Sequence, residues 1–172
     1  MKEPHLLPIR KYGDPVLRRK TKPVAVFDDE LRKTIQAMFR TMYAEPGIGL
    51  AAPQVGLSLR LAVVDVQSDG KNRPLVLINP KIEEARGGVY GMEGCLSLPG
   101  LMFNIRRAEW VRVSAINEKG MPVSLSGDGL FARCLQHELD HLDGKLVIDR
   151  VPLHRRLKAL WEIRKRKKAG LW

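Results

Sequence analysis

Residues 136–141 read Gln-His-Glu-Leu-Asp-His and contain the pattern His-Glu-x-x-His. On a helix, His137 and His141 lie about one turn apart on one face, close enough to bind the same divalent ion. Glu138 would lie beside that ion, where it can manage the proton of a bound water. Histidine occurs four times in 172 residues, so two at ligand spacing around a glutamate favour a metal site over a chance pair.

A catalytic site of this type usually has three protein ligands and an open position, so a third ligand is needed. Cys134 and His141 are seven residues apart, roughly 10 Å along a helix axis, which a short side chain does not span easily. We therefore interpret Cys134 as a small wall residue or an ordinary core cysteine. Cys95 lies in a separate glycine-rich segment, which folding can bring to the helix without strain, so we favour Cys95 as the third ligand.

Zinc proteases with the same motif take a third ligand downstream of it. The extended pattern His-x-x-Gly-x-x-His does not follow His141. Glu162 stands about twenty residues further on, a spacing that some of these proteases use, but a basic run flanks it. The acidic and histidine candidates downstream are Asp143, Asp149, His154 and Glu162.

Residues 47–56, Gly-Ile-Gly-Leu-Ala-Ala-Pro-Gln-Val-Gly, leave a nearly bare backbone that a ligand main chain could approach closely. A lone Gly-x-Gly is weak as a phosphate-binding signal, and no Gly-Lys-Ser/Thr follows it. Gln54 is the one side chain here with an amide N–H to offer. Taken alone, it is equally explained as a polar residue in a turn.

Three helices are expected around these segments. Asp28 or Asp29 caps an amphipathic helix that ends before Pro46. Asp128 begins the motif helix and Gly144 follows it. Pro152 starts a last helix, up to about residue 168, which we expect to bury four apolar residues. The apolar residues expected to face the protein core are Leu31, Ile35, Met38, Phe39 and Met42 in the first helix, Phe131, Leu135, Leu139 and Leu142 in the motif helix, and Leu153, Leu157, Leu160 and Trp161 in the last helix.

Short aliphatic runs at 59–66 and 75–78 predict buried strands, and 81–90 a weaker strand interrupted by two glycines. Residues 110–116 alternate in polarity, and 122–125 return as the second arm of a hairpin. We found no repeat or linker. The prediction is a single α+β domain over residues 1–172, with mixed or antiparallel sheets packed around the central motif helix and with N-terminal and C-terminal helices.

Composition indicates the cellular compartment of this domain and the class of its partners. Its 44% hydrophobic content suits one real core, and its longest apolar runs, such as 61–64, are far too short to span a bilayer. Two cysteines are too few for a disulfide framework, which favours a cytoplasmic, reducing compartment. The net charge of +11 favours polyanionic partners, RNA first among them.

Three motifs together resemble the peptide deformylases. They are residues 47–54, residues 93–97 (Glu-Gly-Cys-Leu-Ser) and residues 136–141, supported by 14–18 and 76–80, and the likeness covers roughly residues 8 to 150. The resemblance implies a bacterial-type or organellar enzyme that removes the N-formyl group from the initiator methionine of nascent chains and releases formate. A metal-bound water would attack the formyl carbonyl, with Glu138 as general base and then acid.

The resemblance also assigns the site. It implies Cys95, His137 and His141 as ligands of one ion, most often Fe²⁺, replaceable by Zn²⁺, Ni²⁺ or Co²⁺. The Gln54 side-chain amide and the Leu96 backbone N–H would stabilise the oxyanion. The backbone of Ile48 and Gly49 would bind the peptide as an added strand, Ile48 and Cys134 would line the methionine pocket, and Glu93 would support the site.

Two features leave alternatives open. Residues 101–104, Leu-Met-Phe-Asn, stand where many family members have a more polar rim. The family's preference for peptide residues after the methionine is therefore not assigned to this chain. Residues 150–172 contain nine Lys or Arg against one acidic residue, which suggests contact with ribosomal RNA for an enzyme that acts on nascent chains. A zinc endopeptidase, or a ribosome- or RNA-binding module with a degenerate metal site, is the alternative function.

Overall fold

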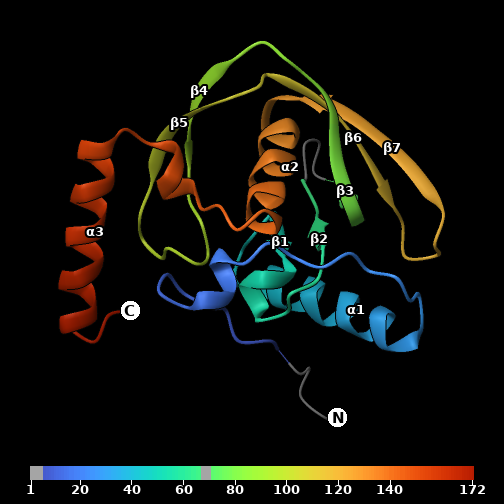
Figure 1. Ribbon diagram of the computed structural model, residues 1–172, viewed down its shortest axis with the longest axis horizontal. Coiled ribbons are helices and arrows are strands. Elements are labelled where there is room, and N and C mark those ends of the chain that lie inside the picture. Colours follow the sequence, from blue (N-terminus) through green and yellow to red (C-terminus); the bar gives the residue numbers. More distant parts are fainter. Residues whose placement is uncertain (1–5, 67–70) are drawn as a thin grey trace.

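The computed structural model describes residues 6–66 and 71–172 and contains two antiparallel sheets around a central helix, α2 (Figure 1). This is the predicted α+β single domain with a helix toward each end. The helices are α1 (Asp29–Ala44), α2 (Gly129–Leu142) and α3 (Leu153–Lys168), with short 3-10 turns η1 (Pro15–Arg18), η2 (Ala52–Val55) and η3 (Val147–Arg150). The strands are β1 (Gly49–Ala51), β2 (Leu61–Val64), β3 (Leu75–Arg86), β4 (Val89–Glu93), β5 (Phe103–Arg107), β6 (Trp110–Ile116) and β7 (Pro122–Asp128).

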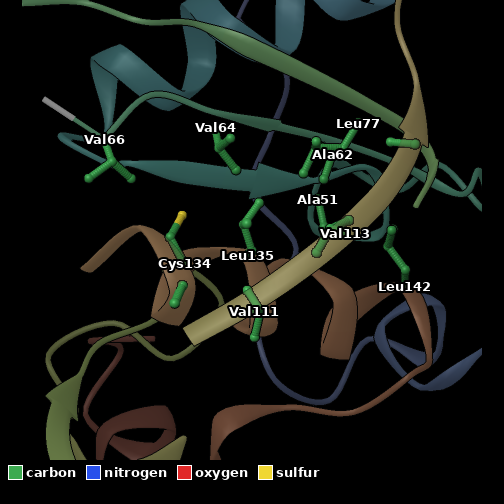
Figure 2. Packing of buried hydrophobic residues seen from close by; sticks show 12 residues of the cluster. Ala51, Ala62, Val64, Val66, Leu77, Val111, Val113, Cys134, Leu135 and Leu142 are labelled. Atoms are coloured by element: carbon green, nitrogen blue, oxygen red, sulfur yellow. The ribbon is translucent and has the colours of Figure 1, made fainter. Parts of the chain in front are cut away.

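The larger sheet has the order β1-β2-β3-β6-β7 and separates two apolar clusters. Successive side chains of a strand point to opposite faces, and all four residues of β2 are buried. Leu61 and Val63 therefore pack with the α1 side, while Val64 packs with the α2 side. Figure 2 shows Leu135 of α2, Val64 of β2 and Val113 of β6 within the second cluster. The motif helix is thus held against the sheet by its own apolar face.

Helix α1 forms as its sequence predicts. The Asp28 side chain accepts a hydrogen bond from the backbone N–H of Leu31 at 2.9 Å, which caps the helix. Ile35, Met38 and Met42 recur at helical spacing and are buried. The helix ends just before Pro46, as expected.

Helix α2 occupies the predicted range, and Gly144 follows it with φ 72°, a left-handed conformation that favours glycine. A Cβ at Gly144 would lie 2.6 Å from the carbonyl oxygen of Arg18, so close packing also requires glycine here. Asp128 is the N-cap residue, but its side chain makes no capping hydrogen bond. Leu135, Leu139 and Leu142 are buried as predicted, whereas Phe131 is only half-buried.

The strands differ from the sequence prediction in three places. β3 continues to Arg86 without interruption, so the glycines at 87 and 88 form the turn into β4. β1 forms part of the glycine-rich segment. β5 was not predicted at all, although Phe103, Ile105 and Arg107 alternate inward along it.

The prediction for the face of α3 was wrong. Leu153, Leu157 and Trp161 are 69%, 57% and 63% exposed, whereas Ala159 and Ile163 are buried. The helix packs on η3 at the edge of the molecule, beside the β4–β5 sheet (Figure 1). A peripheral helix covered on one side buries a narrow stripe, and here that stripe contains Ala159 and Ile163. Across the described ranges, no helix combines the length and the apolar character needed to traverse a membrane.

Candidate metal centre

The three predicted ligands meet beside α2. His137 and His141 stand one turn apart, with their Nε2 atoms 3.2 Å from each other. The Sγ atom of Cys95, from the turn after β4, lies 3.3 Å from the Nε2 atom of His141. Within residues 6–66 and 71–172, this is the group of Cys, His and acidic side chains suited to hold a metal, with all ligand atoms within 4.8 Å of one another.

This cluster fits a divalent ion. Tetrahedral coordination with metal–nitrogen bonds of about 2.0–2.1 Å separates two ligand nitrogens by about 3.3 Å. The observed separation of 3.2 Å agrees with that geometry. A thiolate and two imidazoles are ligands typical of borderline transition metals. Three protein ligands, with space toward the cleft, match a catalytic site better than a structural one.

Local backbone contacts fix the Cys95 turn. The Leu98 N–H donates to the Cys95 carbonyl at 2.9 Å, and the Tyr12 N–H donates to the Ser97 carbonyl at 2.8 Å. Ser97 and Leu98 are fully buried. The turn is therefore anchored on both sides, and Cys95 is held opposite the helix.

Glu93 fixes the orientation of the His137 ring. The Nδ1 atom of His137 lies 2.9 Å from a Glu93 oxygen, which leaves Nε2 facing the cluster. Arg107 binds both oxygens of Glu93 at 3.0 Å, and Arg133 adds a bond of 2.8 Å. Burial alone would raise the pKa of Glu93, but the bonds from His137 and Arg107 outweigh it and bring that pKa to about 2. Glu93 therefore stays ionised in the folded protein.

A chain of buried ion pairs extends this support. Arg107, buried between Glu93 and Asp140, pairs with both carboxylates. Asp140, inside the motif itself, also pairs with Arg150. Arg107 and Asp140 were not predicted from the sequence, since their partners are 10 to 33 residues away. The one available signal was an acidic residue within the His-Glu-x-x-His pattern.

Glu138 lies in the cleft with an oxygen, Oε2, that has no hydrogen-bond partner among the described residues. Burial raises the pKa of Glu138 to about 7, although nearby His137 acts in the opposite direction. The carboxylate lies so close to Gly49 that a Cβ at that position would collide with it. A carboxyl group with a pKa near neutrality is suited to exchange protons.

Gln54 lies next to the cluster and is almost fully buried. Its Oε1 atom accepts a hydrogen bond from the Ala51 N–H at 2.8 Å, which points the Nε2 atom toward Cys95 Sγ (3.7 Å) and Ser97 Oγ (3.4 Å). Leu96 follows Cys95 and lines the same cleft. Both predicted oxyanion donors thus belong to segments that border the metal centre.

The cleft has a volume of about 480 Å³ and contains all the predicted substrate-binding residues, Ile48, Gly49 and Cys134. Ile48 is 38% exposed at its mouth. The Cys134 thiol donates to the Ile48 carbonyl at 3.5 Å, and burial raises its pKa, so it remains a neutral wall residue. Around the mouth stand Met92, Leu101, Met102 and Leu130.

The downstream protease-type candidates are not at the cluster. Asp143 pairs with Arg60, Asp149 with Arg18, and Glu162 with Arg166. His154 is exposed on α3. A third ligand of the protease type is therefore absent from the metal group formed by the described residues.

Comparison with known proteins agrees with this geometry. A family model described as polypeptide deformylase matches residues 6–156. A peptide deformylase of Acidobacterium capsulatum is 46% identical, covering 96% of this chain and 98% of its own. A peptide deformylase of Acidothermus cellulolyticus is 50% identical, covering 95% of this chain and 88% of its own. The crystal structure of a peptide deformylase from Legionella pneumophila superposes with a TM-score of 0.90 at 43% identity, over 96% of this chain and 98% of that one.

Proposed function

The chain belongs to the peptide deformylase family, and we propose a role in its reaction for each residue of the cleft. Members of this family are metal-dependent hydrolases that remove the formyl group from the N-terminus of nascent polypeptides. Cys95, His137 and His141 hold the ion, and Glu138 moves the proton. The observation that supports this most directly is the convergence of three ligand atoms within 4.8 Å beside a buried carboxylate. The comparisons give no support to an endopeptidase or to an RNA-binding module.

The ion itself is proposed to be Fe²⁺ in the native protein, with Zn²⁺, Ni²⁺ or Co²⁺ as replacements. The mixed Cys/His ligand set suits ions of this borderline character. When bound, the ion would act as a Lewis acid and lower the pKa of a water ligand toward about 7. Glu93 would keep the His137 ring oriented toward it.

Glu138 would serve first as base and then as acid. Its unpaired Oε2 atom is available to accept a proton from the attacking water. With a pKa of about 7, the same carboxyl group can then deliver that proton to the amine that leaves. Gly49 makes room for this carboxylate against β1.

Gln54 and Leu96 would stabilise the charge that develops on the formyl oxygen. The Gln54 amide is held by Ala51, so its N–H points toward the cluster before any substrate binds. Leu96 supplies a backbone N–H from the anchored Cys95 turn. Donors that are fixed in advance act without reorganisation during the reaction.

The substrate would bind as an extra strand along β1. β1 is the end strand of its sheet, paired on one side with β2, and it borders the cleft. Main-chain pairing reads a peptide with little demand on its sequence. Ile48 and Cys134 would then contact the methionine side chain.

Helix α3 is proposed to contact ribosomal RNA, and the protein to act in the cytoplasm, where its two free cysteines remain reduced. The last turn of α3 carries Lys165, Arg166, Lys167 and Lys168. Deletion of residues 164–168 should abolish salt-dependent co-sedimentation with ribosomes. Unchanged pelleting would reject this contact.

The substitution Glu138→Gln tests the assigned chemistry. The variant should bind one equivalent of metal but release no measurable formate from formyl-methionyl peptides. Wild-type protein prepared anaerobically is the control for both measurements. Formate release at the wild-type rate by the variant would contradict the role of Glu138, and cleavage of internal bonds in unformylated peptides would favour an endopeptidase.

A further inference from the structure

A second cavity lies behind the motif helix, separate from the cleft. Its volume is about 510 Å³, within the range of small-molecule sites. Its walls come from the back of α2, the β3–β4 turn, the end of β5 and the segment after α2. The charged residues that line it are Arg60, Lys81, Arg106, Arg107, Asp140, Asp143, Lys145 and Arg150.

The cavity and the metal centre use different sides of α2. Gln136, Asp140 and Asp143 face the cavity, whereas His137 and His141 carry the metal-facing nitrogens. At about 100° per residue, the two rows are roughly 110° apart around the helix axis. The body of the helix thus separates a ligand in this cavity from the reacting atoms.

Six Lys or Arg line the walls with two Asp, and Glu93 and Glu83, outside the lining, pair with Arg107 and Lys81. Asp143 is paired with Arg60 at 2.8 Å, and Asp140 is shared by Arg107 and Arg150. These pairs use both carboxylates of the lining.

Three cations remain in addition to those pairs. Lys81 has an exposed partner, Glu83, at 3.2 Å. Arg106 and Lys145 have exposed side chains with no ion pair to any residue in the described ranges. The Arg106 guanidinium rests against Gly88, where a Cβ would collide with it, so glycine lets this cation fold back over the cavity wall.

The back wall is already organised. The Gln136 side chain exchanges hydrogen bonds with the backbone of Ala108 at 2.9 and 3.0 Å, which ties α2 to the turn between β5 and β6. Arg107 is 5% exposed and held by Glu93 and Asp140. Carboxylates thus occupy the donors of Arg107, and a ligand would meet the exposed rim cations Arg106 and Lys145 above this fixed wall.

We propose that this cavity binds a small polyvalent anion that carries two or more phosphate groups. Guanidinium groups suit phosphate oxygens because they offer paired N–H donors in a planar fork. Lys81, Arg106 and Lys145, the three cations outside those pairs, carry more charge than one phosphate group, which has about −1.5 to −2. The volume of about 510 Å³ accommodates a free diphosphate or triphosphate compound, whereas a nucleic-acid strand follows a longer groove.

Titration calorimetry of the metal-loaded protein with inorganic pyrophosphate tests this site. Arg106→Glu/Lys145→Glu should weaken binding by at least about 10-fold, because two rim cations become anions. Arg40→Glu/Lys119→Glu makes the same change in net charge at exposed positions outside the cavity, and should alter the affinity by less than about 3-fold. The milder pair Arg106→Gln/Lys145→Gln should fall between them.

Metal content is measured on the same samples, so that removal of the ion by pyrophosphate is not mistaken for binding in the cavity. Absence of pyrophosphate binding by the wild-type protein would overturn the proposal. So would equal weakening by the cavity and control variants. Binding of a single-stranded RNA oligomer, but not of pyrophosphate, with loss in the cavity variant would instead assign this surface to RNA.

Discussion

Helices α2 and α3 are similar in length, 14 and 16 residues, and apolar residues recur along both, yet they differ in how they are held. α2 is enclosed, and eight of its residues are buried, including Glu138, Asp140 and His141. α3 lies at the edge and buries two, Ala159 and Ile163. The chemistry is located on the enclosed helix.

The difference shows what a metal site requires of its surroundings. His137 directs its Nε2 atom at the other two ligands because Glu93 binds its other nitrogen, and Glu93 is in turn held by Arg107. Such a chain of contacts needs neighbours on several sides, which α3 does not have. α3 instead offers an exposed row of Leu153, Leu157 and Trp161 among basic residues. Substitutions should therefore have large effects on α2 and its neighbours, and small effects on the outer face of α3.

The two cysteines should give the largest contrast. Cys95→Ala removes a ligand, so the protein should lose its metal and at least about 10³-fold in formate release. Cys134→Ala shortens a wall residue near the same cluster and should retain one metal ion and activity within about 10-fold. Metal analysis and formate assays on both variants check this. Loss of metal in the Cys134 variant alone would reverse the assignment.

Gln54→Leu tests the donor beside the metal centre. Removal of one preorganised donor should lower kcat by about 10²–10³-fold, with little change in KM. Metal content should stay at the wild-type value, since Gln54 is not a ligand. An unchanged kcat would show that the Gln54 amide does not stabilise the transition state.

The metal-free protein offers a stability test of the enclosed carboxyl group. The folded-state pKa of Glu138, about 7, is above the ordinary value of 4.5, so the folded chain binds this proton more tightly than the unfolded chain. Stability should therefore fall as pH rises from 4.5 to about 7. Glu138→Gln cannot ionise, and should raise the free energy of unfolding above pH 7 by up to about 3 kcal/mol.

Urea denaturation of metal-free wild-type and Glu138→Gln proteins at about pH 5 and about pH 8 measures this effect. The difference between the two proteins should be small at the lower pH and favour the variant at the higher one. An equal difference at both values of pH would show that the ionisation of Glu138 is not its source.

Glu93→Gln loosens the orientation of one ligand. Because Gln is a weaker acceptor for the His137 N–H and leaves Arg107 underpaired, metal affinity should drop by about 10–100-fold. Glu83→Gln, on exposed β3, is the matched control and should leave the affinity unchanged. Competition with a metal chelator measures both affinities, and equal values for the two variants would exclude a supporting role for Glu93.

The smallest effect belongs to the outer face of α3. Leu157 is 57% exposed, so Leu157→Ala should change the free energy of unfolding by less than about 0.5 kcal/mol. Ile163 is 2% exposed, and Ile163→Ala should cost about 2 kcal/mol or more. Denaturant unfolding of both variants compares them, and a larger loss for the Leu157 variant would mean that the packed face of α3 has been misassigned.

Sequence reasoning succeeded where local signals were strong. The N-cap at Asp28, the glycine at 144 and the helical periodicity of the apolar residues predicted the ends of α1 and α2 well. The spacing of the two histidines, together with the short reach of Cys134, led to Cys95 as third ligand, and the structure brings these three side chains together.

The errors have physical causes. β1 is three residues long, Gly-Leu-Ala, with no β-branched side chain to indicate a strand. In β5, an inward Arg107 breaks the apolar pattern because its charge is paired inside the protein with Glu93 and Asp140. On α3, periodicity identified a helix but could not say which face has a neighbour. Each of these depends on contacts between residues distant in the sequence.

The most direct test adds metal back to anaerobically prepared, metal-free protein and follows formate release from a formyl-methionyl peptide. If Cys95, His137 and His141 form one catalytic site, activity should rise in proportion to bound Fe²⁺ and stop rising at one ion per chain. The Cys95→Ala variant should show no such rise. Full activity without metal, or no formate release from metal-saturated wild-type protein, would contradict the account.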